Sequence, residues 1–278
     1  MTVKESAAIQ GPRRIYADTR LGQMYLQLWP GPPEANDPPV VCLHPIPYSG
    51  VYFDHFAAEL SRRFTVITPD LMGYGGSAPL AEPVELEQHA AAVADALQEQ
   101  GIGQYIPLGF HTGSAVAGEL ALVRPKRVPR LVMITYPLMN EDDRSKQLQG
   151  LGRGSLSGED LECLRRRWRF TVSNRAAGMP LDRAIVNFTE ELRAGDNAWF
   201  GFYSMFSYRP EDRLPQIKQP ALVLNIEGSM KEATRAAAEM LSLAAYEEFS
   251  SMSRGIFELH ATKLAGAVSA FCLAEPDA

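Results

Sequence analysis

The stretch LGFHTGS (residues 108–114) lies between an apolar run typical of a strand and a segment with helical spacing. Its two glycines flank His111, one on each side and each two residues away. When a chain turns from a strand directly into a helix, side chains at those flanking positions collide, so glycine is favoured there. The central residue of such a turn is held above the edge of the sheet. The spacing therefore predicts a tight strand-turn-helix unit with His111 at its apex.

Apolar runs alternate with helical segments on both sides of this turn. Continuous apolar runs of the kind found in strands buried on both faces occur at Val40–Leu43, Phe64–Thr68, Leu131–Thr135 and Ala221–Leu224. Helices are predicted between them at Val51–Arg62, Glu85–Gln100 and Ser114–Val123. This order implies right-handed crossovers and an α/β fold with a mostly parallel sheet. At the start of the chain, alternation in Arg14–Asp18 and Gln23–Trp29 predicts an antiparallel hairpin.

The alternation stops after Tyr136 and resumes at Pro220. Between these points only helices are predicted, at Glu141–Leu151, Gly158–Thr171, Pro180–Ala194 and Asn197–Tyr208. A last helix is expected over Phe257–Phe271. We therefore expect a core made of residues 1–137 and 215–278, interrupted by a helical domain at residues 138–214. Such an insertion at the carboxyl edge of a parallel sheet would cover the crevice where α/β proteins bind ligands, as a lid does.

The composition is that of an ordinary globular protein. Of the 278 residues 46% are hydrophobic and 22% are charged, so a large core can form without a disulfide or a metal. The net charge of −6 argues against nucleic acid as the main partner, because phosphate binding needs a basic patch. The three cysteines, Cys42, Cys163 and Cys272, are far apart and fit no metal-binding or disulfide spacing, which favours a reducing compartment.

Neither a signal peptide nor a membrane span is expected. Residues 1–14 (MTVKESAAIQGPRR) contain no apolar stretch. No apolar run approaches the ~18 residues that a membrane span requires. We expect a cytoplasmic protein whose partner is a small-molecule substrate and not a membrane. The sequence leaves the oligomeric state open, a homodimer included.

Three further segments place the turn at His111 in a known pattern. CLHPIP (residues 42–47) ends one apolar run, DLMGYGGS (70–77) follows the next, and RPKRVPRL (124–131) leads into a third. In this order and at these spacings, together with LGFHTGS, they resemble the α/β-hydrolase family from about residue 13 to residue 273. The resemblance implies an eight-stranded, mostly parallel sheet flanked by helices, with a helical cap inserted after the sixth strand. It also implies a nucleophile elbow at His111 and chemistry without a metal or organic cofactor.

The catalytic positions depart from the family pattern. The elbow of the family carries a serine, aspartate or cysteine where this chain has His111. The family acid would fall at Ser229, with Glu227 the nearest carboxylate, and the family base would fall at Ser253, beside Arg254. The histidines stand at positions 44, 55, 89, 111 and 260, none of which is the base position. A Ser–His–Asp triad therefore cannot be assembled from this sequence.

The chemistry is expected to depend on His111. Imidazole has an unperturbed pKa of about 6.5, so neutral histidine is available at pH 7 as a nucleophile or a general base. By resemblance, the backbone N–H groups of Ile46 and Thr112 would form the oxyanion hole. Substrate contacts are expected from His44, Tyr48, Phe110, Trp199, Tyr203 and Phe206. These residues favour cleavage of a small, mainly apolar ester, lactone or carbon–carbon bonded carbonyl compound.

Other functions are compatible with the same residues. A lyase, decarboxylase, cyclase or cofactor-free oxygenase could use His111 as acid and base, and a catalytically silent protein could bind a ligand in the same pocket. Glu141, Asp142 and Asp143 are candidates to orient His111, although acidic residues also suit the first turn of a helix. The arginines at positions 165, 166, 167 and 169 fit a solvated helix face or a carboxylate clamp.

Overall fold

The strands of the described residues form one eight-stranded sheet. In this computed structural model, which describes residues 11–151, 161–195 and 197–274, the strand order is β1-β2-β4-β3-β5-β6-β7-β8. β1 pairs antiparallel with β2 and β2 with β4, and the other neighbours are parallel. The strands are β1 Arg13–Thr19, β2 Gly22–Trp29, β3 Val40–Leu43, β4 Val66–Pro69, β5 Ile106–Phe110, β6 Leu131–Ile134, β7 Ala221–Ile226 and β8 Ala244–Phe249. The predicted sheet and its opening hairpin are confirmed.

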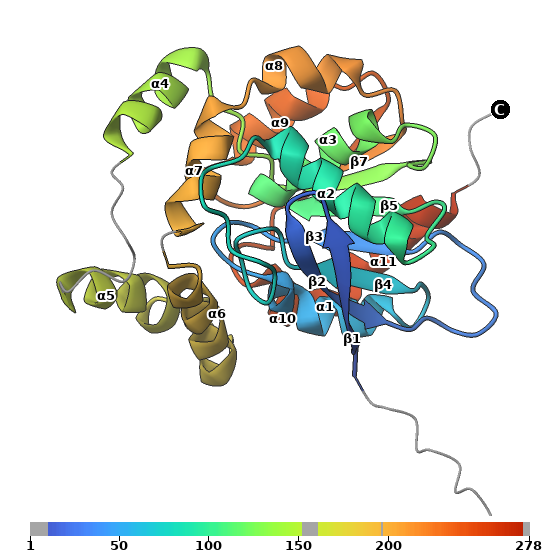
Figure 1. Cartoon of the computed structure of the whole chain (residues 1–278), viewed down its shortest axis with the longest axis horizontal. Coiled ribbons are helices and arrows are strands. Elements are labelled where there is room, and N and C mark those ends of the chain that lie inside the picture. The colour runs from blue at the N-terminus through green and yellow to red at the C-terminus, as the bar shows by residue number, and fades with distance from the viewer. Residues whose placement is uncertain (1–10, 152–160, 196, 275–278) are drawn as a thin grey trace, which may run out of the picture.

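Helices cover both faces of the sheet (Figure 1). α2 and α3 pack on one face, and α1 and α11 pack together on the other. The helices of this core are α1 Asp54–Leu60, α2 Leu86–Glu99, α3 Thr112–Val123, α9 Lys231–Glu239, α10 Ile256–Leu259 and α11 Ala261–Leu273. A 3₁₀ turn at Gly50–Phe53 precedes α1, so the helix expected over Val51–Arg62 is a 3₁₀ turn followed by a shorter α-helix.

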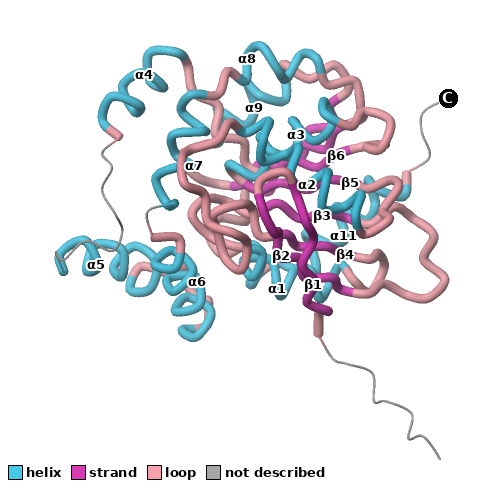
Figure 2. The backbone as a smooth tube through the Cα atoms, in the orientation of Figure 1, coloured by secondary structure: helices cyan, strands magenta, loops and turns pink. Residues whose placement is uncertain are grey.

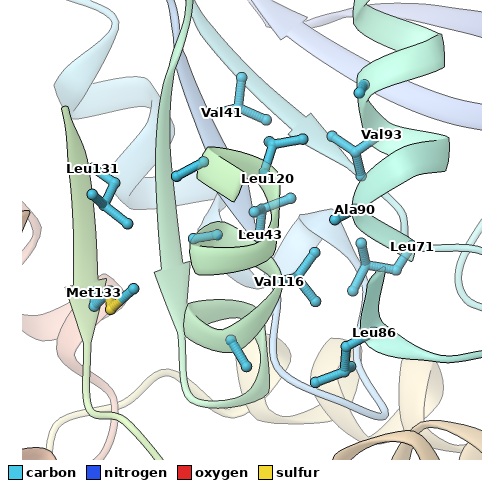
Figure 3. Packing of buried hydrophobic residues seen from close by; sticks show 14 of the residues in the cluster. Val41, Leu43, Leu71, Leu86, Ala90, Val93, Val116, Leu120, Leu131 and Met133 are labelled. Atoms are coloured by element: carbon cyan, nitrogen blue, oxygen red, sulfur yellow. The ribbon is translucent and has the colours of Figure 1, made fainter. Parts of the chain in front are cut away.

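The two faces of the sheet carry two hydrophobic cores, because successive side chains of a strand point to opposite sides. On β3, Val41 and Leu43 belong to the core under α2 and α3, whereas Val40 and Cys42 belong to the core under α1 and α11. Figure 3 shows the first of these cores, with side chains of α2 and α3 meeting those of β3 and β6. Both faces of the central strands are therefore buried, as their continuous apolar runs predict.

Between β6 and β7 the chain forms helices and no strand among the described residues. We call residues 138–214 the cap segment; its helices are α4 Glu141–Gly150, α5 Leu161–Trp168, α6 Leu181–Arg193, α7 Asn197–Ser207 and α8 Pro210–Arg213. A π-helical turn at Arg169–Ser173 extends α5, and residues 158–160, where that helix was expected to begin, lie outside the described residues. Figures 1 and 2 show α4 to α7 gathered on one side of the core.

The predicted C-terminal helix is wrong in one respect. Phe257–Phe271 is not continuous: α10 ends at Leu259, and α11 begins at Ala261. His260 separates them with φ −129° and ψ 20°, which lie outside the helical range. Apolar periodicity on both sides of His260 hid this break, since both helices bury a face against the same core.

Two glycines allow α3 to pack against the sheet. A Cβ atom at Gly113 would lie 2.0 Å from the carbonyl oxygen of Leu43, and one at Gly109 would lie 2.1 Å from that of Gly113. Both contacts are with backbone atoms, which cannot rotate away. The spacing of glycines around His111 is therefore a packing requirement between β3, β5 and α3.

We expect Gly113→Ala to lower the free energy of unfolding by about 3 kcal/mol or more, because the new methyl group overpacks a site closed by backbone. Gly266→Ala is the matched control, since a Cβ there meets nothing within 4 Å on helix α11. The control should gain up to about 1 kcal/mol from helix propensity. Urea unfolding of both variants checks this, and equal stability of the two would contradict the packing argument.

Candidate active site at the elbow

His111 occupies the apex of the turn between β5 and α3. Its φ is 55° and its ψ is −121°, a conformation that non-glycine residues rarely adopt. The N–H of His111 donates to the carbonyl oxygen of Ile134 at 3.0 Å, which ties the turn to the end of β6. Strained backbone of this kind costs about 1–3 kcal/mol and persists where the surroundings hold it. The geometry is that of the predicted elbow.

The imidazole of His111 lines a cavity of about 490 Å³ between the core and the cap segment. We call it the elbow cavity. Its core residues are Pro45, Ile46, Pro47, Tyr48, Tyr52, Phe110, His111, Thr135, Ile226, Glu227, Gly228, Ser229, Met230, Arg254 and Gly255. Its cap residues are Arg167, Phe170, Thr171, Arg175, Ala176, Met179, Asn187, Glu191 and Phe202. The cavity thus opens at the carboxyl ends of the parallel strands, where α/β folds bind ligands.

The ring of His111 is neutral and has no protein partner among the described residues. Burial lowers the pKa of His111 to about 4. Its Nδ1 is buried without a hydrogen bond, and the nearest aromatic ring is that of Phe110, with centroids 6.5 Å apart. A neutral imidazole has one N–H and one lone pair. Both nitrogens of His111 are therefore uncommitted to protein groups and suited to act on a ligand.

One of the expected oxyanion donors is engaged in this structure. The N–H of Ile46 donates to the hydroxyl of Thr112 at 2.8 Å, and both residues are buried. Thr112 itself stands at the first position of α3, where backbone N–H groups have no partner within the helix. Ile46 lines the elbow cavity with its amide engaged by Thr112, whereas Thr112 is 1% exposed and is not among the residues that line the cavity.

The family positions for the acid and the base lie near the elbow cavity but hold other residues. Ser229 and Glu227 line the cavity after β7, and Arg254 lines it after β8. Glu227 is about half exposed and pairs with Lys231 at 3.4 Å. The acidic residues Glu141, Asp142 and Asp143 occupy the first turn of α4 and do not line the cavity. No carboxylate of the described residues hydrogen-bonds the His111 ring.

Of the expected substrate contacts, Tyr48 and Phe110 line the elbow cavity. Trp199, Tyr203 and Phe206 of α7 do not line it, and Phe202 of the same helix does. On α7, Phe202 stacks on Phe206 with centroids 6.2 Å apart, and Trp199 packs edge-on against Tyr203 with centroids 6.3 Å apart. The expected contacts from Trp199, Tyr203 and Phe206 are therefore not among the residues that line the cavity.

His44 has a structural position and not the expected place in the substrate site. It is fully buried and does not line the elbow cavity. Its Nε2 accepts from the N–H of Leu71 at 2.9 Å, and its Nδ1 lies 3.1 Å from the carbonyl oxygen of Pro45. Burial lowers the pKa of His44 to about 4, so the ring is neutral, with Nδ1 as the donor. His44 thus joins the loop after β3 to the loop after β4.

A buried polar cluster on the cap segment was not anticipated from the sequence. The carboxylate of Glu191 is 1% exposed and accepts from the Tyr48 hydroxyl at 2.6 Å and from the Thr171 hydroxyl at 2.5 Å. Arg167 lies 3.6 Å from its other oxygen. Tyr48 belongs to the core and the other three to the cap segment, so the cluster joins the two parts. Helical periodicity gave no signal for it, since Glu191 lies on a polar stretch of α6.

Thr135 was also missed as a site residue. It follows β6, has φ 53°, and its buried hydroxyl has no hydrogen-bond partner. It lines the elbow cavity with His111. The end of the apolar run Leu131–Thr135 was the available signal, since neighbouring parallel strands end at the same edge of the sheet.

The described residues contain no group of three or more His, Cys, Asp or Glu side chains arranged to hold a metal ion. Within the same ranges, no helix combines the length and apolar character needed to cross a membrane.

Comparison with known proteins agrees with this architecture. A family model described as alpha/beta hydrolase fold matches residues 38–155. The solved enol-lactonase of Burkholderia xenovorans LB400 superposes with a TM-score of 0.78 at 17% identity, over 94% of this chain and 100% of that chain. This chain has the α/β-hydrolase fold. A thermophilic esterase from Thermogutta terrifontis agrees, with a TM-score of 0.72 at 19% identity over 93% of this chain and 97% of that chain.

Curated relatives match the α/β-hydrolase-fold chain over a shorter stretch. Lipase LipV of Mycobacterium tuberculosis is 30% identical over 109 residues, which are 39% of this chain and 41% of that protein. A putative carbamate hydrolase, RutD of Escherichia coli, is 36% identical over 112 residues, 40% of each chain. This chain thus matches about two fifths of the length of these relatives.

The buried state of His111 predicts an unusual titration. Because its pKa is lowered to about 4 in the folded protein, the ring should stay neutral down to about pH 5. The unfolded chain takes up this proton near pH 6.5, so stability should fall as the pH drops from about 6.5 toward 4. Proton NMR of the imidazole, assigned with His111→Gln, measures the midpoint. A midpoint at 6 or above would contradict the buried, unpartnered placement.

Proposed function

We propose that this protein is a hydrolase of small, mainly apolar carbonyl compounds, with His111 as its reacting residue. The observation that carries the proposal is the imidazole itself: it is held on a strained elbow, lines the elbow cavity and has no protein partner among the described residues. The relatives named lipase, esterase, enol-lactonase and putative carbamate hydrolase support an ester-like substrate.

Neutral His111 supports two routes to the same products. In one, a ring nitrogen attacks the carbonyl carbon, the ester C–O bond breaks, and the alcohol leaves with the ring proton. Water then cleaves the acyl-imidazole to the acid and restores the ring. In the other, the ring takes a proton from water as that water attacks the carbonyl, and returns it to the leaving alkoxide. The low pKa of His111 means that it holds a proton only transiently in either route.

The oxyanion of either route would be held by backbone donors. Thr112 is the first residue of α3, where the helix dipole favours negative charge, and its N–H would serve as one donor if the substrate reaches below the lining of the elbow cavity. Rotation of the Thr112 hydroxyl would release the N–H of Ile46 as a second donor. In this proposal the cap segment acts as a lid, since Phe202 and Glu191 close the elbow cavity from that side.

Ligand binding without turnover is the second candidate. It is favoured by the hydrogen bond between Ile46 and Thr112, which occupies one expected oxyanion donor. It is also consistent with the family base position, where the chain has Ser253 and Arg254.

We expect His111→Ala to lower kcat/KM for short-chain esters and lactones by about 10²–10⁴-fold, the usual contribution of a general acid–base group. His55→Ala is the matched control, because His55 is exposed on α1 and does not line the elbow cavity. A panel of aryl esters, lactones and vinylogous diketones, assayed with wild type and both variants, provides the measurement. Circular dichroism verifies that each variant keeps its fold.

The outcomes separate the two candidates. Activity lost in His111→Ala and kept in His55→Ala supports the hydrolase. Equal activity in wild type and His111→Ala contradicts a role for His111 in the reaction. Ligand binding with no turnover in either protein supports the second candidate.

A further inference from the structure

We propose that the elbow cavity takes a substrate that carries a carboxylate, held by Arg175 and Arg254. The proposal deepens the proposed function, on which it rests for the identity of the reacting carbonyl. It is carried by the charges of the side chains that line the cavity, which are those of Arg167, Arg175, Arg254, Glu191 and Glu227. Two of these cations have no anionic partner among the described residues.

Both carboxylates of the elbow cavity are already matched by cations. Glu191 pairs with Arg167 at 3.6 Å and accepts two hydroxyl hydrogen bonds. Glu227 lies 3.4 Å from Lys231, a cation that it shares with Glu248. His111 is neutral at pH 7 and adds no charge. Arg175 is half-buried and Arg254 is exposed, and no carboxylate of the described residues neutralises either of them, so both are available to an anionic ligand.

Arg175 is held in place by backbone carbonyls alone. Its Nε donates to the oxygen of Met179 at 2.9 Å, and its Nη1 donates to that of Val172 at 3.1 Å. No carboxylate of the described residues forms an ion pair with it. These two bonds use two of the five guanidinium N–H donors and fix the plane of the group, so the remaining donors are available to a ligand.

Arg254 is anchored to the cap segment in the same way. Its Nη1 donates to the carbonyl oxygen of Asn174 at 3.3 Å and its Nη2 to that of Phe170 at 2.9 Å. The guanidinium also lies 4.4 Å from the centre of the Phe170 ring. Arg254 too lacks an ion pair within the described part of the chain. It comes from the core loop after β8, so both parts of the molecule contribute a cation to the cavity.

Guanidinium groups ordered in advance suit a carboxylate. Arginine presents planar pairs of N–H donors that match the two oxygens, and such charge-assisted bonds are stronger than neutral ones. Because the arginines are already ordered by backbone contacts, binding a carboxylate costs less side-chain entropy. Apolar groups line the same cavity, among them Phe110, Met179 and Phe202. The ligand that fits has a carbonyl for His111, an apolar middle and a carboxylate end.

The test compares the binding of hexanoate and hexanamide, which have the same chain but differ in charge, by isothermal titration calorimetry. We expect wild type to bind hexanoate at least about 10-fold more tightly. Arg175→Gln and Arg254→Gln should each reduce this preference, and the double variant should abolish it. Arg166→Gln is the matched control, since Arg166 is exposed on α5 and does not line the elbow cavity; its preference should equal that of wild type.

Equal affinity of wild type for the two ligands would overturn the proposal, whatever the variants do. So would a preference for hexanoate that persists in the double variant. Because these measurements need no turnover, they separate this proposal from the proposed function: hexanoate selectivity that depends on the arginines supports the carboxylate site even if no ester is hydrolysed. If wild type does hydrolyse esters, monomethyl adipate should be preferred over dimethyl adipate, and the double variant should reverse or remove that preference.

Discussion

The contact between Gly113 and the carbonyl oxygen of Leu43 is the constraint on which the site depends. It lets α3 approach β3 so closely that no side chain fits between them. The approach forces the residue at the turn into the left-handed region and lifts it over the sheet edge. The N–H of that residue, His111, is then bound by the end of β6. Two central strands and one helix thus hold a single imidazole in a strained but well-supported position.

In the elbow cavity, charged side chains surround the neutral imidazole of His111. Burial keeps His111 neutral, and none of the described carboxylates hydrogen-bonds its ring. Of the two carboxylates that line the cavity, Glu227 follows β7, and Glu191 belongs to the cap segment and is held by Tyr48 and Thr171. The charged side chains that line the cavity come from both parts of the molecule: Glu227 and Arg254 from the core, and Arg167, Arg175 and Glu191 from the cap segment.

Local patterns predicted the elements better than the contacts between them. Val40–Leu43 was predicted to the residue, since a strand buried on both faces has a continuous apolar run with few alternatives. Trp199, Tyr203 and Phe206 of α7 were expected to contact the substrate, whereas Phe202 is the residue of that helix that lines the cavity. His44 was expected at the substrate, and its hydrogen bonds with Pro45 in its own loop and with Leu71 in the loop after β4 instead make it structural. The spacing of residues along a helix or strand shows which of them share a face. Which neighbouring element that face packs against depends on the tertiary structure.

The sequence alone determined the α/β-hydrolase fold, the elbow and the place of His111 on it. Apolar runs and turn residues act between neighbours in the chain, and the order and spacing of the motifs resemble those of the α/β-hydrolase family. Only the tertiary structure decided what surrounds the imidazole. Arg175, Glu191 and Arg254 come from segments far apart in sequence, and their roles depend on which carbonyls and carboxylates lie within hydrogen-bond distance. Those distances are set by how the cap segment packs on the core, which no local pattern encodes.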